Sequence, residues 1–248
     1  MSKNSNIIAL TMGDPSGVGT EIAIRAKIKK IKKPDFFIIH DVDFVKKILK
    51  KMKSKLKVRE ISSPSEVKKL PNNYLAVLPI KISKNTQLGK KNLSNVKSIL
   101  ASIDLAVKLA KNGEIAAIVT NPINKDVIGK KVKNFKGHTE YLAKKDRTND
   151  QLMMMMNKNL KTIPLTTHIA INKVSNEINK KNIIKAIINA DVSLRKDFKI
   201  KKPRIAVTAL NPHAGDGGLI GDDEKVKIIP AINYLSLIHI SEPTRRLV

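Results

Sequence analysis

The sequence predicts an α/β protein with two lobes, and three observations support this prediction. Short apolar runs alternate with longer amphipathic runs, which is typical of strand–helix units that build a parallel sheet. The 248 residues are enough for one large domain or two modest ones, and the alternation restarts near the middle of the chain. The hydrophobic content of 42% suits an ordinary globular core. We therefore place a first lobe at residues 1–125 and a second at 126–234.

The first lobe reads as strands and helices in strict alternation. We expect strands at residues 6–12, 35–40, 73–80 and 114–120, and helices at 19–30, 41–52 and 92–113. The helix at 41–52 begins with acidic residues and ends with lysines, which suits the helix dipole. The helix at 92–113 ends on Asn112 and Gly113, a common C-terminal stop.

In the second lobe the pattern is "QLMMMMN", "KTIPLTTHIA", a helix over roughly 176–198, and "RIAVTAL" before an acidic helix start. We interpret the methionines at 153–156 as a core strand, because methionine packs well in apolar interiors. The runs at 161–170 and 204–210 are also expected to be strands.

Composition excludes several classes of protein. With no cysteine, the chain has no disulfide, thiolate metal site or cysteine nucleophile. No apolar run approaches the ~18 residues of a membrane span, and the start lacks the apolar core of a signal peptide, so we expect a cytoplasmic protein. The net charge of +27 comes mainly from lysines spread over the predicted helices, and only 3% of residues are aromatic. We therefore do not expect nucleic-acid binding, although the charge would attract a small anionic substrate.

The loop "TMGDPSGVGTE" (11–21) joins the first strand to the first helix. Gly13, Gly17 and Gly19 would let backbone N–H groups face a phosphate or carboxylate at a helix N-terminus. A purely structural turn explains these glycines equally well, and Asp14 could either cap that turn or orient a ligand. The spacing matches neither a Walker A loop nor a dinucleotide fingerprint.

The segment "GHTEYL" (137–142) reads as a helix start. An imidazole and a hydroxyl side by side, His138 and Thr139, would bind a phosphate or carboxylate there. Alternatively, Thr139 caps the helix and Glu140 complements its dipole. The residues alone leave both readings open.

Two further histidines follow predicted strands. His168 lies in "PLTTHIA" and His213 in "ALNPHAGDGG". Neutral imidazoles from two strand ends would suit a divalent cation, but a catalytic metal site uses about three protein ligands. His40 and His239 do not supply the third, since His40 belongs to the first lobe and His239 to a tail discussed below.

Together the motifs resemble the 4-hydroxythreonine-4-phosphate dehydrogenase family of vitamin B6 biosynthesis. The motifs that carry the resemblance are "TMGDPSGVGTEI", "VTNPINK", "GHTEYLA", "TTHIA" and "LNPHAGDGGLIGDDE", in the family's order from about Ile7 to about Tyr234. The resemblance implies a two-lobed α/β/α, isopropylmalate dehydrogenase-like fold. It also implies a homodimer whose active site lies between lobes and across the dimer interface.

The resemblance further implies the chemistry. NAD or NADP oxidises the 3-hydroxyl of 4-phosphohydroxy-L-threonine, and the product loses CO2 to give 3-amino-2-oxopropyl phosphate. His168 and His213 are then two of three ligands of a divalent metal (Zn²⁺, or Mg²⁺, Co²⁺ or Mn²⁺), while His138 and Thr139 contact the phosphorylated substrate. Asp216 and Glu224 are supporting or capping groups.

The end of the chain departs from the family. Residues 235–248, "LSLIHISEPTRRLV", match nothing expected of the family, and we interpret them as an artefact. The family's third metal-binding histidine and its later substrate contacts are missing from this chain, so we expect an incomplete, inactive fragment.

Two rival functions remain. A paralogous dehydrogenase acting on D-threonate or D-erythronate 4-phosphate would carry the same metal ligands. A non-catalytic basic protein that binds polyanions would instead use the lysine excess, with a steep salt dependence.

Overall fold

The computed structural model describes residues 6–29, 35–148 and 150–237. The chain divides into two compact units, residues 1–148 and 149–248. The sequence placed the lobe boundary at 125/126, so the segment 126–148 belongs with the first unit in this division. None of the described helices is long and apolar enough to cross a membrane.

The first unit is built on a parallel sheet of five strands in the order β3-β4-β2-β1-β5. The strands are β1 (Ile7–Leu10), β2 (Asp35–His40), β3 (Lys57–Glu60), β4 (Tyr74–Pro79) and β5 (Ala117–Val119). The helices are α1 (Gly19–Ile28), α2 (Val42–Lys51), α3 (Val96–Lys111), α4 (Lys125–Gly129) and α5 (His138–Asp146). These elements confirm the α/β prediction, and β3 is a strand that the sequence analysis missed.

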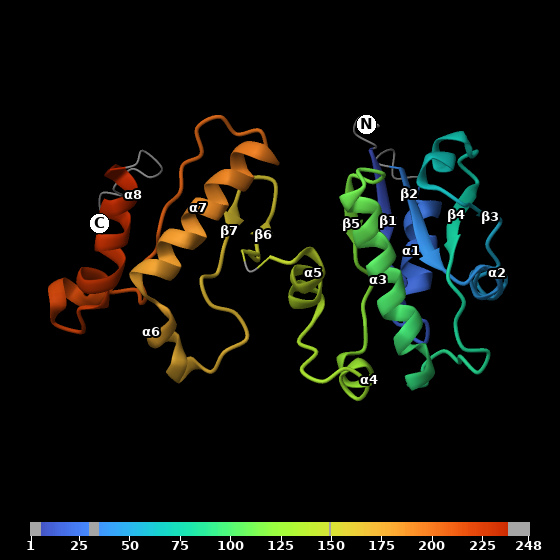
Figure 1. Ribbon diagram of the computed structural model, residues 1–248, viewed down its shortest axis with the longest axis horizontal. Coiled ribbons are helices and arrows are strands. Elements are labelled where there is room, and N and C mark those ends of the chain that lie inside the picture. Colours follow the sequence, from blue (N-terminus) through green and yellow to red (C-terminus); the bar gives the residue numbers. More distant parts are fainter. Residues whose placement is uncertain (1–5, 30–34, 149, 238–248) are drawn as a thin grey trace. The chain divides into compact units, whose positions relative to one another are not determined.

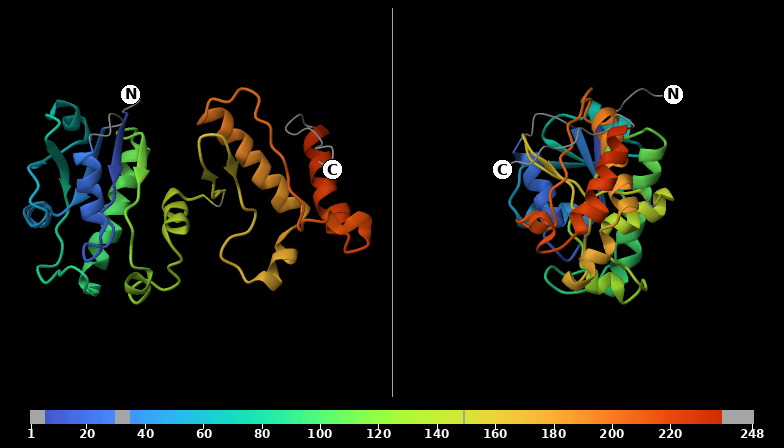
Figure 2. Two further views of the ribbon diagram at one scale, coloured as in Figure 1. Left: turned by 180° about the vertical axis from the view of Figure 1, so that it is seen from behind. Right: turned by 90° about the vertical axis from the view of Figure 1, so that its left-hand side faces the viewer.

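Alternate residues of each strand point to opposite faces of the sheet, so each face carries apolar side chains. Helices cover both faces and bury these side chains. Ile7 and Ala9 of β1 pack in a cluster with α3, whereas Leu10 packs in a second cluster with α1 and α2. Figure 1 shows α3 in front of the sheet, and Figure 2 shows α1 in front of it from behind. This is the α/β/α layering of a doubly wound fold.

The second unit is mainly helical in its described part. Its elements are β6 (Met155–Met156), β7 (Lys161–Thr162), α6 (Val174–Glu177), α7 (Lys180–Lys196) and α8 (Ile229–Leu237). Helices α7 and α8 share an apolar cluster that includes Ile183, Ile187 and Leu235.

Three predicted strands of this unit form only in part or not at all. Met155 and Met156 pair with β7, but each is 56% exposed, so the predicted methionine core strand is wrong. Residues 204–210 form no strand, although Ile205 and Val207 still turn toward the α7–α8 cluster. A strand needs a neighbouring strand whose backbone forms hydrogen bonds with its N–H and C=O groups. No strand among the described residues pairs with residues 204–210.

Candidate functional site

The glycine-rich loop between β1 and α1 packs against the loop that follows β5. Gly13 has a φ of +70°, and a Cβ there would lie 2.7 Å from the Cβ of Asn121 and 2.8 Å from the carbonyl oxygen of Pro122. Asp14 N donates to the same carbonyl at 2.9 Å. Only glycine combines this left-handed backbone with so close an approach.

Asn121 ties the two loops together. Its side-chain amide donates to the carbonyl of Thr11 at 3.0 Å, and its backbone N–H donates to the Thr11 hydroxyl at 3.3 Å. A Cβ at Gly19 would lie 3.1 Å from the Asn121 Cβ, so a second glycine of the loop is needed for the same contact. Asn121 lies in the motif "VTNPINK", but its role could not be predicted from the sequence, because it depends on contact with Thr11, which is 110 residues away.

This junction lies where an open α/β sheet usually binds ligands. The chain runs from β1 to β2 on one side, while β5 is added on the other side of β1, so the strand order reverses between β1 and β5. Ligands of such sheets bind at the carboxyl ends of the strands beside this reversal.

Asp14 serves the turn itself. Its carboxylate accepts from the backbone N–H of Ser16 at 2.9 Å, and its carbonyl accepts from Gly17 N at the same distance. The buried hydroxyl of Ser16 has no partner among the described residues. Helix α1 begins after Val18 with no side-chain cap, so its first N–H groups remain free to face an anion.

His40 is a structural histidine. Its Nδ1 accepts from the backbone N–H of Asp41 at 2.8 Å, and its Nε2 lies 2.9 Å from the hydroxyl of Thr20, which places the ring proton on Nε2. Burial lowers the pKa of His40 to about 4, against the opposing effect of the Asp41 charge. The ring is therefore neutral at physiological pH and joins α1 to the end of β2.

Helix α5 begins at His138, as the sequence predicted. Its N-cap is Gly137 and no side chain caps it, so Thr139 lies in the first turn and the capping reading of Thr139 is wrong. The Nε2 atom of His138 is buried and has no hydrogen-bond partner among the described residues. The pKa of His138 is lowered, first by burial and then by the charge of Lys125, the last residue of the motif "VTNPINK", to which the sequence assigned no role of its own.

The two histidines of the second unit lie in exposed, strained loops rather than at strand ends. His168 has a φ of +58°, and Ala214 and Asp216 beside His213 have φ values of +50° and +44°. Such backbone costs about 1–3 kcal/mol per residue and concentrates at functional sites. The backbone N–H of His213 donates to the Asn211 side chain at 2.9 Å.

Glu224 holds the His213 loop in place. One carboxylate oxygen accepts from Leu210 N at 3.0 Å, and the other would lie 3.0 Å from a Cβ at Gly215. A Cβ at Gly215 would also lie 2.5 Å from the Gly221 carbonyl oxygen, so this turn needs glycine. Asp216 donates its backbone N–H to the His213 carbonyl at 2.8 Å.

No group of three or more histidine, aspartate and glutamate side chains is placed to hold one metal ion within residues 6–29, 35–148 and 150–237. His168 and His213 therefore stay predicted ligands, and His239 lies outside the described residues.

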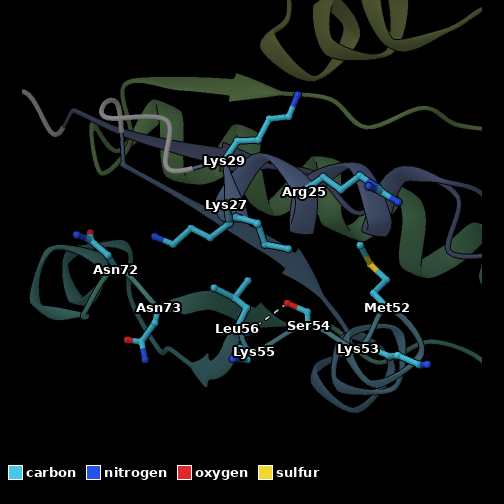
Figure 3. Close-up of a pocket in the computed structure, with 11 residues that line it drawn as sticks. Arg25, Lys27, Lys29, Met52, Lys53, Ser54, Lys55, Leu56, Asn72 and Asn73 are labelled. Carbon is cyan, nitrogen blue, oxygen red and sulfur yellow. Dashed lines mark hydrogen bonds between the residues drawn. The ribbon is translucent and has the colours of Figure 1, made fainter.

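A basic hollow of about 890 Å³ lies beside the amino ends of β3 and β4 (Figure 3). Its cations are Arg25, Lys27, Lys29, Lys53 and Lys55. They surround the C-terminal ends of α1 and α2, where positive charge complements the helix dipoles. The positive charge around the hollow is thus explained by its place at two helix C-termini. The hollow lies apart from the glycine-rich loop.

Comparison with known proteins gives a consistent result. The profile of the family described as "Pyridoxal phosphate biosynthetic protein PdxA" matches residues 32–244. The chain is 35% identical over 238 residues to the 4-hydroxythreonine-4-phosphate dehydrogenase of Wigglesworthia glossinidia brevipalpis, covering 96% of this chain and 71% of that protein. It is 32% identical to the enzyme of that name from Pseudoalteromonas translucida, covering 92% and 69%.

Solved structures agree. The crystal structure of 4-hydroxythreonine-4-phosphate dehydrogenase from Klebsiella pneumoniae matches with a TM-score of 0.89 at 30% identity, covering 96% of this chain and 74% of that one. A terephthalate 1,2-cis-dihydrodiol dehydrogenase from Burkholderia xenovorans shares the fold, with a TM-score of 0.63 at 20% identity.

Proposed function

Because the chain belongs to the PdxA family of pyridoxal phosphate biosynthetic proteins, we infer that it is a 4-hydroxythreonine-4-phosphate dehydrogenase, an oxidoreductase of vitamin B6 biosynthesis. The observation that carries this function is the family match across residues 32–244. The substrate is a phosphorylated amino acid, 4-phosphohydroxy-L-threonine, and a nicotinamide cofactor accepts the hydride. Loss of CO2 from the oxidised product then gives 3-amino-2-oxopropyl phosphate.

His138 and Thr139 contact the substrate in this proposal. They stand in the uncapped first turn of α5, where backbone N–H groups and the helix dipole favour an anion. The buried, unpaired Nε2 of His138 supports the assignment, because a buried polar atom without a partner is costly until a ligand pairs with it.

The glycine-rich loop binds a second anionic group of the substrate. Gly13 and Gly19 allow the loop to pack closely against Asn121. The start of α1, which has no side-chain cap from its N-cap residue Val18, lies beside the point where the strand order reverses. Asp14 acts by shaping the turn through its bond to Ser16 N.

His168 and His213 would hold a divalent metal. Imidazole is a suitable donor, and both rings are exposed on loops, but the described residues supply no third ligand beside them. A divalent ion held by these residues would supply Lewis-acid chemistry. Glu224 would support the site by fixing the His213 loop. The cofactor is NAD or NADP, the metal is Zn²⁺ or another divalent ion, and the protein is a homodimer in this proposal.

The test is to measure substrate binding and NADH formation side by side. The purified protein is given NAD⁺, Zn²⁺, Mn²⁺ or Co²⁺, and either 4-phosphohydroxy-L-threonine or D-erythronate 4-phosphate. We expect 4-phosphohydroxy-L-threonine to raise the melting temperature more than the sugar-acid phosphate, since a ligand of the native state stabilises it.

Binding without NADH formation would support the assignment of the substrate but not that of the oxidation. The absence of both binding and turnover would contradict the proposed function. A stronger response to D-erythronate 4-phosphate would move the protein to the paralogous activity, and salt-sensitive binding of polyanions alone would favour the basic binding protein.

A further inference from the structure

The amino group of Lys125 lies over the start of helix α5. A Cβ at Gly137 would be 3.4 Å from Lys125 Nζ and 3.5 Å from Lys125 Cε. Gly137 is the N-cap of α5, so the absence of a side chain there makes room for the lysine. Lys125 is itself the first residue of α4, whose N-cap Asn124 accepts from Val127 N at 3.2 Å. The backbone that carries the lysine is thereby fixed.

This position is electrostatically unfavourable for a cation on its own. The N-terminus of a helix carries partial positive charge, and His138 is the next residue after Gly137. Lys125 forms no ion pair with any carboxylate among the described residues. Its neighbour Asp126 instead pairs with Lys91 at 3.2 Å. Glu140 approaches the same point, with an oxygen 3.4 Å from a Cβ at Gly137, but remains beyond ion-pair distance of the lysine.

We propose that Lys125 is a substrate-binding residue, and that its ammonium group pairs with the phosphate group held at the start of α5 by His138 and Thr139. A phosphate there would receive hydrogen bonds from the lysine, the imidazole, the hydroxyl and the free backbone N–H groups of the first turn. It would also give the buried Nε2 of His138 a partner. The inference rests on the proposed function for the identity of the phosphorylated ligand.

The charge of Lys125 also sets the state of the imidazole. Together with burial it holds the pKa of His138 below its ordinary value, so the ring is neutral when phosphate arrives. The neutral ring can place its proton on Nε2 and donate to a phosphate oxygen. Glu140, the acidic group that faces the same point, would compete with phosphate for the lysine.

The experiment uses inorganic phosphate as the probe and the imidazole NMR signal of His138 as the readout, without cofactor. A His138→Gln variant assigns the signal among the five histidines. Four further variants are compared: Lys125→Met, Lys125→Arg, Glu140→Gln, and Lys130→Met, which removes an exposed lysine at the other end of the same short helix.

Phosphate should shift the His138 signal saturably in the unaltered protein. We expect Lys125→Met to weaken binding by about tenfold, as for loss of one charge-assisted hydrogen bond. Lys125→Arg should recover most of the affinity and Lys130→Met should leave it unchanged. Glu140→Gln should tighten binding. In the absence of phosphate, Lys125→Met should raise the pKa of His138, which would verify that the charge of the lysine acts on this ring.

Equal phosphate affinity in Lys125→Met, an equal loss in Lys130→Met, or no saturable response in the unaltered protein would each overturn the proposal. A Lys125-dependent response to L-threonine in place of phosphate would overturn it too, because the bound group would then be a carboxylate. Lys125 is exposed, so we expect these variants to fold, and unchanged amide spectra would verify it. Lys125-dependent phosphate binding by a protein whose melting temperature does not respond to 4-phosphohydroxy-L-threonine, and which does not oxidise it, would contradict the proposed function alone.

Discussion

The buried imidazole of His40 should make the first unit lose stability as the pH falls. In the folded protein its pKa is about 4, chiefly because burial disfavours the charged ring, whereas its ordinary value is 6.5. Between these values the unfolded chain binds a proton that the folded chain rejects, so acid favours unfolding. The contribution of His40 is therefore complete above pH 6.5 and is lost as the pH falls from 6.5 toward 4.

The size of the effect follows from the two pKa values. Each unit of pKa difference is worth about 1.4 kcal/mol, so the full loss is about 3 kcal/mol, of which about 2 kcal/mol is lost by pH 5. That is a large part of the about 5–15 kcal/mol that stabilises an ordinary domain. Protonation would also cost the bond that Nδ1 accepts from Asp41 N at 2.8 Å.

The assay is urea unfolding followed by circular dichroism from pH 7 to pH 4, on the unaltered protein and on His40→Gln. Carboxylates titrate in the same range, but they are common to both proteins and cancel in the difference. The variant loses the Thr20 contact and the stacking on Phe44, so it is less stable at pH 7. We expect this deficit to shrink by about 3 kcal/mol at pH 4. A deficit that is constant across the range would refute the assignment of a neutral, buried His40.

Two further predictions concern the loops. Gly13→Ala should destabilise the protein by more than about 2 kcal/mol in the same unfolding assay, because its Cβ would meet Asn121; Gly89→Ala, also at positive φ (+79°) but with open space around it, should cost only about 1 kcal/mol. His213→Ala should weaken Zn²⁺ binding in calorimetry while leaving the melting temperature unchanged, since His213 makes its hydrogen bonds to other described residues through its backbone, with Asn211 and Asp216. Zn²⁺ binding that is unaltered by this change would remove His213 from the metal site.

The first unit was predictable from sequence because its elements are defined locally. Asp41 caps α2 by accepting from Phe44 N at 2.9 Å, and Gly113 at a φ of +71° follows the end of α3. Both signals lie within a few residues of the element they delimit. The strand β3 was missed because its sequence, "KVRE", is short and mostly exposed, so apolar periodicity does not mark it.

The second unit was less predictable because strands depend on partners that local sequence does not specify. Residues 204–210 have the composition of a buried strand, and Ile205 and Val207 do face an apolar cluster. Yet hydrogen-bonded pairing requires a neighbouring strand at the right distance, which no periodicity in the segment itself can supply.

The site residues divide along the same line. Gly13 and His138 were visible because glycine in a strand–helix loop and a histidine at a helix start are unusual in themselves. Asn121 and Lys125 lie in the motif "VTNPINK", but their individual roles could not be predicted, because each acts across a junction, on Thr11 and on Gly137 respectively. In both junctions a glycine lacks the side chain that would fill the space, and a polar residue occupies it, from the loop after β5 in one case and from the start of α4 in the other. A segment of five residues, 121–125, therefore supports the glycine-rich loop at one end and faces the start of α5 at the other. Substitutions there should affect stability through Asn121 and anion binding through Lys125, and the two effects should separate by residue.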